Sequence, residues 1–350
     1  MTASPTTRSI RSIMRKIEEG EKLNILTFPT HERYEENLCK TGHNFYAFEH
    51  GKKWDTTYAK VPENYHIISS LPEEVDFDLV LSHTSCDRVL VAMQLLSKTN
   101  SLEKMNIPIL RHCHILPNPH LDVDMQTQSA QYKSVPVSRD SFISKFNSNA
   151  WGFQDGEASI VEHGVDTDFW HPDDSIYRDN VCLSVVNDWP NRDWCCGFGL
   201  WGASVGLKTE YQLPVRVYGN SPGFSEPAKD TNHLRQIYQS SRIFYNTSLH
   251  SPVPTVLMEA MACGCAIVST NTCMIPEIIE HGKNGLLSND PNELRSFLEM
   301  LLNNEELAKQ LGAAARETMV ERFSLDRFVQ SWNKLLYDTV ENYTYKNGDA

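Results

Sequence analysis

The sequence predicts an α/β protein built from two doubly wound domains, each with a parallel sheet between helices. The chain has 350 residues, which suits two domains of about 150 residues better than one core. Along it, short apolar runs alternate with helical patterns, and such alternation is typical of parallel sheets covered by helices. Ligands of such sheets bind at the carboxyl ends of the strands, so we expect a site in the cleft between the two domains.

The first half of the chain contains five predicted strands and three predicted helices. Strands are expected at residues 23–28, 42–48, 76–83 and 107–114, and a last strand with its exit loop at 158–166. Helices are expected in "ERYEENLCK" (32–40), "CDRVLVAMQLLSK" (86–98) and "SRDSFISKF" (138–146), the last with a serine cap.

The second half repeats this pattern and ends in helices. Strands are expected at 181–186, 214–219, 242–246 and 265–270, and helices at 233–240, around Glu259, and at 291–301, 304–319 and 325–341. The periodicity breaks in "HGVDTDFWHPDD" (163–174). We therefore predict an N-terminal arm (1–20), an N-terminal domain (21–165), a C-terminal domain (166–323) and a final helical segment (324–350).

Composition limits the classes of partner and compartment. The net charge of −13 disfavours broad coating of nucleic acid, which needs a basic surplus. Nine cysteines without a CxxC pair are typical of reduced thiols, and the N-terminus lacks the apolar region of a secretory signal. We expect a cytoplasmic protein. Residues 8–17 combine basic and apolar side chains at helical spacing, which fits weak contact with the inner membrane face, a frayed arm, or a helix packed on the protein body.

The segment "SPVPTVLMEAMACGCAIVST" (251–270) carries the chemistry. Pro254 suits the first turn of a helix, and Gly264 suits its left-handed end. The N–H groups at that helix start form an anion site suited to phosphate. Glu259 lies about one turn further on, where a carboxylate matches the two hydroxyls of a ribose. The alternative is that Glu259 only complements the helix N-terminus.

The wider segment "RIFYNTSLHSPVPTVLMEAMACGCAIVSTNTCMIPEIIEHGKNGLL" (242–287) resembles the donor-site signature of GT4-type retaining glycosyltransferases, which have the GT-B fold. "IVEHGVDTDFW" (160–170) is similar to the interdomain segment of that family. The resemblance implies two Rossmann-like domains facing across a cleft, with the C-terminal helix crossing back to the first domain. It also implies transfer of a sugar from a nucleotide-sugar donor, with retention of anomeric configuration.

The resemblance implies donor-binding roles for a set of residues in the C-terminal domain. Glu259 would hold the ribose, and the backbone amides of Thr255 and Val256 the diphosphate. Arg192 falls close to the family's lysine position and suits phosphate oxygens, or it is a surface arginine on the following helix. Gly219, at the end of the predicted strand 214–219, is a further donor-binding candidate.

The chain departs from the family pattern at several of these positions. The family's first glutamate is Ser251 here, eight positions before Glu259, and the usual glycine-rich loop carries prolines. Asn187 or Asp188 stands at the family's arginine position, and Cys273–Met274 replaces a glycine pair. Glu277 is retained and is either structural or directed at the sugar. We expect Ser251 to decide donor-sugar specificity or loss of activity.

Two histidines are the catalytic candidates of the first domain. Alternation in "RHCH" (111–114) places His112 and His114 on one face of a strand and Cys113 on the other. The resemblance implies that His114, or second His112, orients the donor and stabilises charge, without a protein nucleophile. His83 is a further candidate. Hydrogen-bonded structural histidines are one alternative, and a His-x-His metal pair is another, for which no third ligand is evident.

Three functions remain open at this stage. The first is a glycosyltransferase that uses a nucleotide-sugar as co-substrate and needs no metal or other cofactor. Its acceptor would be a glycan, a lipid-linked sugar or another small molecule. The second is a GT-B nucleotide-sugar epimerase or hydrolase, and the third is a catalytically degenerate nucleotide-sugar-binding protein. A dehydrogenase is disfavoured because no GxGxxG follows the first strand.

Overall fold

A computed structural model describes residues 20–56, 59–84, 86–98 and 107–348 of the chain. The chain divides into two compact units, which we call the N-terminal unit (residues 1–162 and 326–350) and the C-terminal unit (163–325). The basic segment 8–17 lies outside the described residues, so its predicted membrane contact stays a prediction. No described helix is both long and apolar enough to cross a bilayer.

The N-terminal unit is built on a sheet in which every paired strand runs parallel to its neighbour. The strand order is β3-β2-β1-β4-β5-β6-β7. These strands are β1 (Asn24–Thr27), β2 (Asn44–Phe48), β3 (Tyr65–Ile68), β4 (Leu79–His83), β5 (Ile109–Cys113), β6 (Arg139–Phe142) and β7 (Ser159–Ile160). All residues of β4 and β5 are buried, as expected for central strands covered on both faces.

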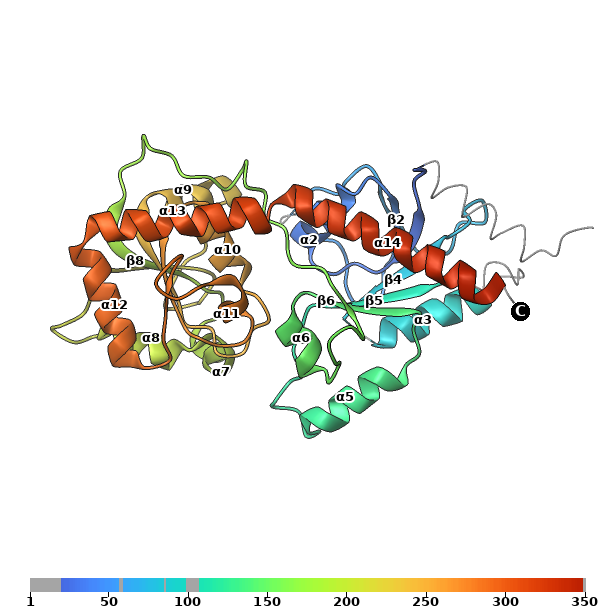
Figure 1. Cartoon of the computed structure of the whole chain (residues 1–350), viewed down its shortest axis with the longest axis horizontal. Coiled ribbons are helices and arrows are strands. Elements are labelled where there is room, and N and C mark those ends of the chain that lie inside the picture. Colours follow the sequence, from blue (N-terminus) through green and yellow to red (C-terminus); the bar gives the residue numbers. More distant parts are fainter. Residues whose placement is uncertain (1–19, 57–58, 85, 99–106, 349–350) are drawn as a thin grey trace, which may run out of the picture. The chain divides into compact units, whose positions relative to one another are not determined.

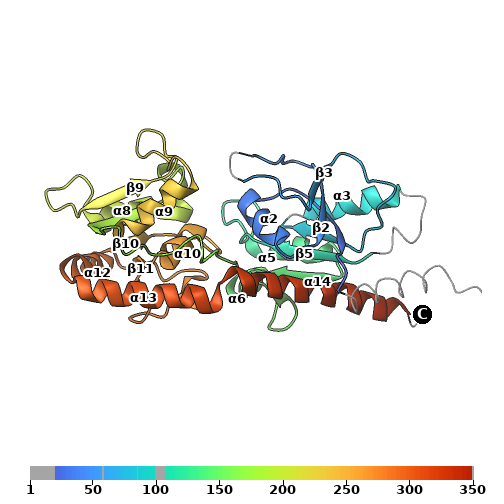
Figure 2. The same cartoon turned by 90° about the horizontal axis from the view of Figure 1, so that it is seen from above.

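Helices flank this sheet in Figures 1 and 2. They are α2 (Glu32–Cys39), α3 (Cys86–Ser97), α5 (Met125–Ser134), α6 (Lys145–Ala150) and the C-terminal α14 (Leu325–Gly348). From Asp326 onward α14 belongs to the N-terminal unit, where its buried Trp332 packs against the ring of His112. The predicted return of the C-terminal helix to the first domain is therefore confirmed.

The C-terminal unit contains a second, all-parallel sheet with the order β12-β11-β10-β8-β9. Its strands are β8 (Asp179–Val185), β9 (Val215–Tyr218), β10 (Ser241–Asn246), β11 (Ala266–Ser269) and β12 (Leu286–Leu287). Its helical segments are η1 (Pro190–Arg192), α7 (Asp193–Cys196), α8 (Phe198–Val205), α9 (Thr231–Gln239), α10 (Thr255–Ala262), α11 (Ile275–Ile278), α12 (Pro291–Asn303) and α13 (Glu305–Arg322).

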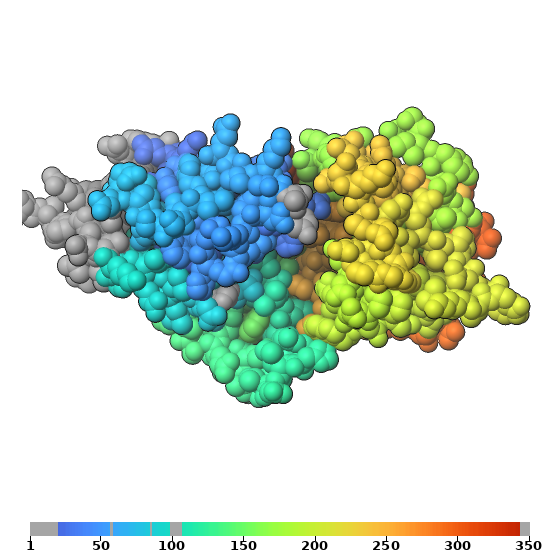
Figure 3. Space-filling model, turned by 180° about the vertical axis from the view of Figure 1, so that it is seen from behind, coloured from blue at the N-terminus to red at the C-terminus, as the bar shows by residue number. Residues whose placement is uncertain are grey.

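Apolar side chains of α8 and α12 cover one face of this second sheet. Trp201 of α8 and Leu298 of α12 belong to the same buried cluster as Cys182 of β8 and Ile243 of β10. In the view of Figure 3, the yellow-green to yellow segment between β8 and β10 forms most of the visible surface of this unit. The strands of this sheet are thus packed into a core, and binding residues are commonly found on loops that such a core positions.

Each sheet has one point at which the chain reverses the direction in which strands are added. In the N-terminal unit this point lies between β1 and β4, and in the C-terminal unit between β8 and β10. The loops that follow such a pair of strands turn to opposite faces, which leaves a crevice at the carboxyl ends. The topology therefore singles out two places: the loops after β1 and β4, and those after β8 and β10.

The helix predicted at residues 138–146 is wrong. Residues Arg139–Phe142 form β6, which pairs with β5 on one side and β7 on the other. The helix begins only at Lys145, where the side chain of Ser144 accepts a hydrogen bond from the Asn147 N–H at 2.9 Å. The serine that caps a helix is therefore Ser144, not the Ser138 that begins the predicted helix, and the two apolar residues before Ser144, Phe142 at the end of β6 and Ile143, are buried.

Candidate functional site

The donor-binding candidates of the C-terminal unit gather at one edge of its sheet. Asn187 follows β8, Gly219 follows β9, and Ser251 lies between β10 and α10. Glu277 lies in α11, which follows β11. Because these strands are parallel neighbours, their carboxyl ends meet at the same edge. Residues that are about 90 positions apart in sequence are thus brought to one side of one sheet.

Glu259 lies in α10, the helix that follows β10 at the reversal point. Its side chain is almost buried, with 5% of its surface exposed, and its Oε2 accepts a hydrogen bond from the hydroxyl of Tyr238 at 3.2 Å. Gly264 ends the helix region with a φ of +76°, the left-handed conformation expected from the sequence. The carboxylate is therefore held by a rigid neighbour rather than exposed on a helix face.

The start of α10 carries N–H groups that the helix itself does not use. Leu257 N–H bonds to the Pro254 carbonyl at 3.0 Å, whereas the structure assigns the N–H groups of Thr255 and Val256 no acceptor among the described residues. Thr255 is exposed and Val256 is half-buried. Amide groups in this position attract an anion, since the helix dipole adds to their partial positive charge.

The loop between β10 and α10 is fixed from the segment after β11. The hydroxyls of Thr270 and Thr272 each donate to the Ser248 carbonyl at 2.6 Å. The Cys273 thiol donates to the Leu249 carbonyl at 3.5 Å. Cys273 takes the place of a family glycine yet keeps a φ of +52°, so the backbone retains the left-handed conformation. Ser251 is half-buried and lies between the anchored residues Ser248 and Leu249 and the start of α10.

The segment after β8 is closely tied to the end of β9. Asn187 Oδ1 accepts a hydrogen bond from Asn220 N–H at 2.8 Å, so this side chain is used inside the protein. Gly219 has a φ of +128°, and a Cβ built there would lie 2.0 Å from the Val186 carbonyl oxygen. Gly219 thus has a packing reason to be glycine, whatever its part in binding. Arg192 is exposed, and its Nη1 donates to the Asn187 carbonyl at 3.4 Å.

Glu277 is half-buried in the short helix α11, and its backbone carbonyl accepts from Arg322 of α13. Met274, which precedes α11, is fully buried. These contacts fit a structural role for the segment that holds Glu277, because α11 is anchored through its backbone and its apolar residues. A sugar-directed role for the Glu277 carboxylate stays a prediction.

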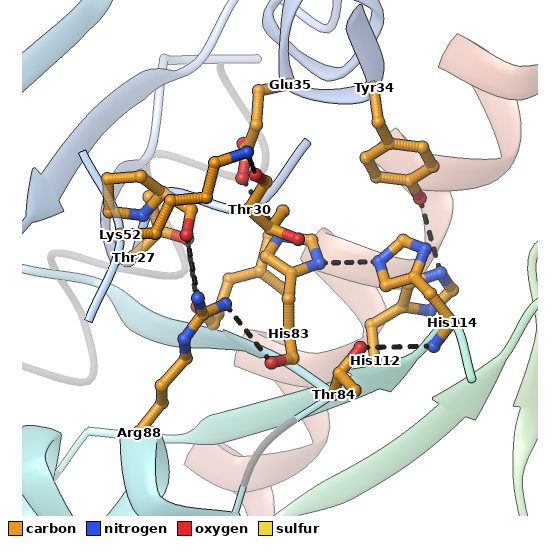
Figure 4. A network of polar contacts seen from close by, with 12 residues as sticks. Thr27, Thr30, Tyr34, Glu35, Lys52, His83, Thr84, Arg88, His112 and His114 are labelled. Carbon is orange, nitrogen blue, oxygen red and sulfur yellow. Dashed lines mark hydrogen bonds and ion pairs between the residues drawn. The ribbon is translucent and has the colours of Figure 1, made fainter. Parts of the chain in front are cut away.

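The histidine candidates of the N-terminal unit form one cluster at the carboxyl ends of β4 and β5 (Figure 4). The rings of His112 and His114 lie 4.6 Å apart between centroids, on the same side of the strand as alternation predicts. His83 Nδ1 lies 2.8 Å from His114 Nε2. Tyr34 of α2 packs edge-on against His114, with ring centroids 4.4 Å apart.

His112 is enclosed by protein groups. It is fully buried, its Nε2 lies 3.2 Å from the Tyr34 hydroxyl, and its Nδ1 lies 2.8 Å from the Ser141 hydroxyl. The Tyr34 hydroxyl accepts from Trp332 Nε1 at 3.2 Å, so its own proton is available for His112 Nε2. These contacts fit the structural alternative for His112. His114 is half-buried and is the one of the pair that we carry forward as a catalytic candidate.

Sequence reasoning missed Glu35 of α2. Its carboxyl is fully buried, and its Oε1 lies 3.7 Å from His83 Nε2. Burial raises the pKa of Glu35 to about 8, against the lowering effect of the Arg88 charge. Burial also lowers the pKa of His83 well below its usual range. The polar and charged residues of "ERYEEN" are typical of a solvent-exposed helix face, so this pattern predicts an exposed rather than a buried Glu35.

The metal alternative gains no support from the donor set. Among the described residues, no three His, Cys, Asp or Glu side chains are arranged so that they would hold a metal ion. The short distance between His83 and His114 is that of a hydrogen bond between two imidazoles.

The two parallel-sheet units define the class of fold, which is GT-B. Anabaena HepE in complex with UDP superposes with a TM-score of 0.70 at 13% identity, covering 91% of this chain and 100% of that chain. Sucrose-phosphate synthase from Thermosynechococcus elongatus gives a TM-score of 0.70 at 15% identity, with 91% and 99% covered. The fold predicted from the sequence is therefore confirmed.

The segment that contains α10 is similar in sequence to known glycosyltransferases. Residues 224–318 match the model of the family described as Glycosyl transferases group 1. N-acetyl-alpha-D-glucosaminyl L-malate synthase of Bacillus anthracis is 37% identical over 95 residues, which is 27% of this chain and 24% of that protein. Alpha-maltose-1-phosphate synthase of Mycolicibacterium smegmatis is 30% identical over 121 residues, 32% of this chain and 30% of that protein. The resemblance to GT4-type glycosyltransferases is thereby confirmed, and these matches span less than a third of each relative's length.

Proposed function

We propose that this chain is a retaining glycosyltransferase, a hexosyl- or pentosyltransferase that moves a sugar from a nucleotide-sugar to an acceptor. The donor would bind at the carboxyl edge of the C-terminal sheet. In the proposal Glu259 holds the ribose, the amides of Thr255 and Val256 hold the diphosphate, and Arg192 offsets the phosphate charge.

One observation carries this proposal. The almost buried Glu259 lies one turn inside a helix whose first N–H groups point out at the reversal point of a parallel sheet. That arrangement presents a phosphate-binding terminus and a ribose-binding carboxylate from the same helix. It lies within the segment that matches the glycosyl transferases group 1 family. Solved neighbours with the same fold contain UDP or UDP-glucose, which supports a nucleotide-sugar as the donor class.

The chemistry needs no protein nucleophile. The bond between the anomeric carbon and the diphosphate oxygen breaks, and the acceptor oxygen bonds to the same carbon on the same face. The acceptor's hydroxyl proton goes to the departing phosphate oxygen, which leaves a nucleoside diphosphate and a glycoside. Donors fixed around the phosphates stabilise the charge that develops there. His114 would orient the donor and stabilise charge, and Ser251 and Glu277 are the remaining candidates for contacting the sugar.

The acceptor is proposed only as a class: a glycan, a lipid-linked sugar or another small molecule. The structural neighbour GtfA contains UDP and GlcNAc, and the neighbour TarM contains alpha-GlcNAc-glycerol with UDP. These compounds support a sugar-bearing or small hydroxyl acceptor. The cytoplasmic location and the membrane contact of residues 8–17 stay predictions.

The test is a donor screen. The protein is incubated with a panel of UDP-, GDP- and ADP-sugars, with and without candidate acceptors, and free nucleotide is measured. Release that depends on an acceptor supports the proposal, and NMR of the anomeric proton in the product then tests retention. Release of nucleotide without any acceptor would favour a hydrolase, and a changed sugar on the recovered nucleotide an epimerase.

A degenerate binding protein is the other candidate. The serine at 251 and the loss of the family arginine at 187 or 188 favour it. It predicts that donor binds without release across the whole acceptor panel.

A further inference from the structure

A buried acid and two histidines, Glu35, His83 and His114, follow one another in the N-terminal unit, and we call them the polar relay. Glu35 comes from α2, which follows β1, and His83 ends β4. These are the two strands that flank the reversal point of this sheet. His114 follows β5. These polar groups thus run from Glu35, beside the reversal point of the sheet, through His83 to the half-buried His114 (Figure 4).

At the buried end of the polar relay, Glu35 and His83 are not joined by an ordinary hydrogen bond. Glu35 and His83 are both fully buried, and in the described structure Glu35 Oε1, Glu35 Oε2 and His83 Nε2 make no hydrogen bond of normal geometry, although the backbone of Thr30 lies close enough to lower the pKa of Glu35. Oε1 of Glu35 lies 3.7 Å from His83 Nε2, so these atoms face each other. Buried polar atoms normally have partners, so an exception calls for a physical explanation. At this distance the charge of the carboxyl decides whether Nε2 of His83 carries a proton.

The contact between His83 and His114 couples the protonation of His83 Nε2 to the tautomer of His114. His83 Nδ1 and His114 Nε2 are 2.8 Å apart, so a single hydrogen lies between them. When Glu35 is neutral, its proton faces His83 Nε2, His83 donates from Nδ1, and neutral His114 carries its proton on Nδ1. When Glu35 is ionised, His83 carries its proton on Nε2 and accepts from His114 Nε2–H. When Glu35 ionises, the polar relay therefore loses one proton, which is released to solvent from His114 Nδ1.

We propose that Glu35 and His83 are positioning residues that set the tautomer of His114, on Nδ1 when Glu35 is protonated and on Nε2 when it is ionised. Only the use of this device in catalysis rests on the proposed function. There it would decide whether a given nitrogen of His114 donates to, or accepts from, the groups of a bound sugar.

The surroundings of Glu35 are suited to a change of charge in the neutral pH range. Its carboxyl has a pKa of about 8 because burial outweighs the attraction of Arg88. Arg88 itself bonds the carbonyls of Pro29 at 2.8 Å and His83 at 3.4 Å, so it ties together the loops after β1 and β4. The titratable and charged groups that act on Glu35 are Glu32, Tyr34, Cys39, Lys52, Tyr65, His83 and Arg88. Burial raises the pKa of both Tyr65 and Cys39, which therefore stay neutral when Glu35 titrates.

Histidine tautomers can be read directly by NMR. The full-length protein is labelled with ¹⁵N-histidine, and long-range ¹H–¹⁵N spectra are recorded between pH 6 and pH 10 without substrate. We expect His114 to change from the Nδ1–H to the Nε2–H form in one step with a midpoint near pH 8. In Glu35→Gln, whose amide cannot ionise, this step should be absent. Glu36→Gln, an exposed neighbour, is the matched control and should keep the step.

The wild-type titration decides the question even if a variant fails to fold. A His114 tautomer that stays the same from pH 6 to pH 10 overturns the proposal, and so does an unchanged step in folded Glu35→Gln. The readout needs neither donor nor acceptor, so a failure of the proposed function leaves it intact. If the chain is a transferase, Glu35→Gln should also lose the limb of the pH–rate profile near pH 8, whereas Glu36→Gln should retain it.

Discussion

The hydroxyl of Tyr238, at the end of α9, donates a hydrogen bond to Oε2 of Glu259 in α10 at 3.2 Å. Tyr238 is fully buried, and this bond connects the helix before β10 to the helix after it. It uses one acceptor site of the Glu259 carboxylate, a group that offers about four such sites. Tyr238 thus fixes the direction in which the carboxylate is presented.

Tyr238→Phe should weaken nucleotide binding without abolishing it. The variant keeps the aromatic ring and loses one hydrogen bond to a carboxylate, so affinity for a nucleoside diphosphate should fall by about two- to tenfold. Isothermal titration calorimetry measures the change. Tyr177→Phe, whose side chain is 77% exposed, is the control and should bind as the wild type does. An unchanged affinity in a fully folded Tyr238→Phe would show that the carboxylate does not need this support.

Ser251→Ala should separate sugar transfer from nucleotide binding. The loop that holds Ser251 is anchored through Ser248 and Leu249, so the substitution leaves that frame in place. We expect nucleoside diphosphate affinity within twofold of wild type, and a rate of sugar transfer lowered by about two- to tenfold. Ser296→Ala on the exposed face of α12 is the control. Equal losses in binding and transfer would place Ser251 in the nucleotide site instead.

Gly219→Ala should destabilise the C-terminal unit more than an ordinary glycine substitution in a turn. Its Cβ would lie 2.0 Å from the Val186 carbonyl oxygen, at a backbone atom that cannot move away. We expect a loss of about 3 kcal/mol from overpacking, added to the left-handed strain. Gly223→Ala is the control, because Gly223 has a φ of +78° and open space around it.

The control should lose only about 1–2 kcal/mol, the cost of left-handed backbone in an L-residue. Urea-induced unfolding gives both numbers. Similar losses in the two variants would mean that the loop after β9 shifts readily, and the close contact would then carry no special weight.

Stability of the N-terminal unit should fall as pH rises through the neutral range. A carboxyl whose folded-state pKa is raised from 4.5 to about 8 contributes stability below pH 4.5, and this contribution is lost as pH rises through 8. The full effect corresponds to roughly 5 kcal/mol as an upper limit, from about 1.4 kcal/mol per pH unit. Glu35→Gln should gain on the wild type by a large part of that amount between pH 5 and pH 9.

Hydrogen exchange of the β4 amides in increasing urea follows this unit separately from the other. Glu36→Gln should track the wild type across the same range. If the difference between Glu35→Gln and wild type is independent of pH, Glu35 is ionised in the folded protein at neutral pH, and the account of its burial is wrong.

The elements predicted well were those whose pattern is local. The strands before α10 and α3 are short apolar runs, and α10 is bounded by Pro254 and Gly264, so their positions followed from the sequence. Residues 138–146 failed because a cap and a strand overlap there: Ser144 caps a helix, but the four residues of β6 are stabilised by pairing on both sides, which the local pattern does not reveal. Helix α5 was missed altogether, since its residues lack an apolar stripe.

The candidate site divides in the same way. Glu259 could be selected as a candidate because a carboxylate inside an apolar helix is unusual in itself, and its role stays a prediction. Glu35 was missed because its burial depends on β4, whose His83 is 48 positions further along. The enclosure of His112 depends on Trp332, 220 positions away in α14. Local spacing carries no signal for contacts that the tertiary fold alone creates.

The central claim is that Glu259 binds the ribose of a nucleotide, and a thermodynamic cycle tests it most directly. Dissociation constants of UDP, GDP and ADP, and of their 2′,3′-dideoxy forms, are measured for wild type, Glu259→Gln and the exposed control Glu280→Gln. Removing the ribose hydroxyls should weaken wild-type and control binding by about 10- to 100-fold, the worth of hydrogen bonds to a charged group, and should cost Glu259→Gln much less. Equal losses in wild type and Glu259→Gln would contradict the claim.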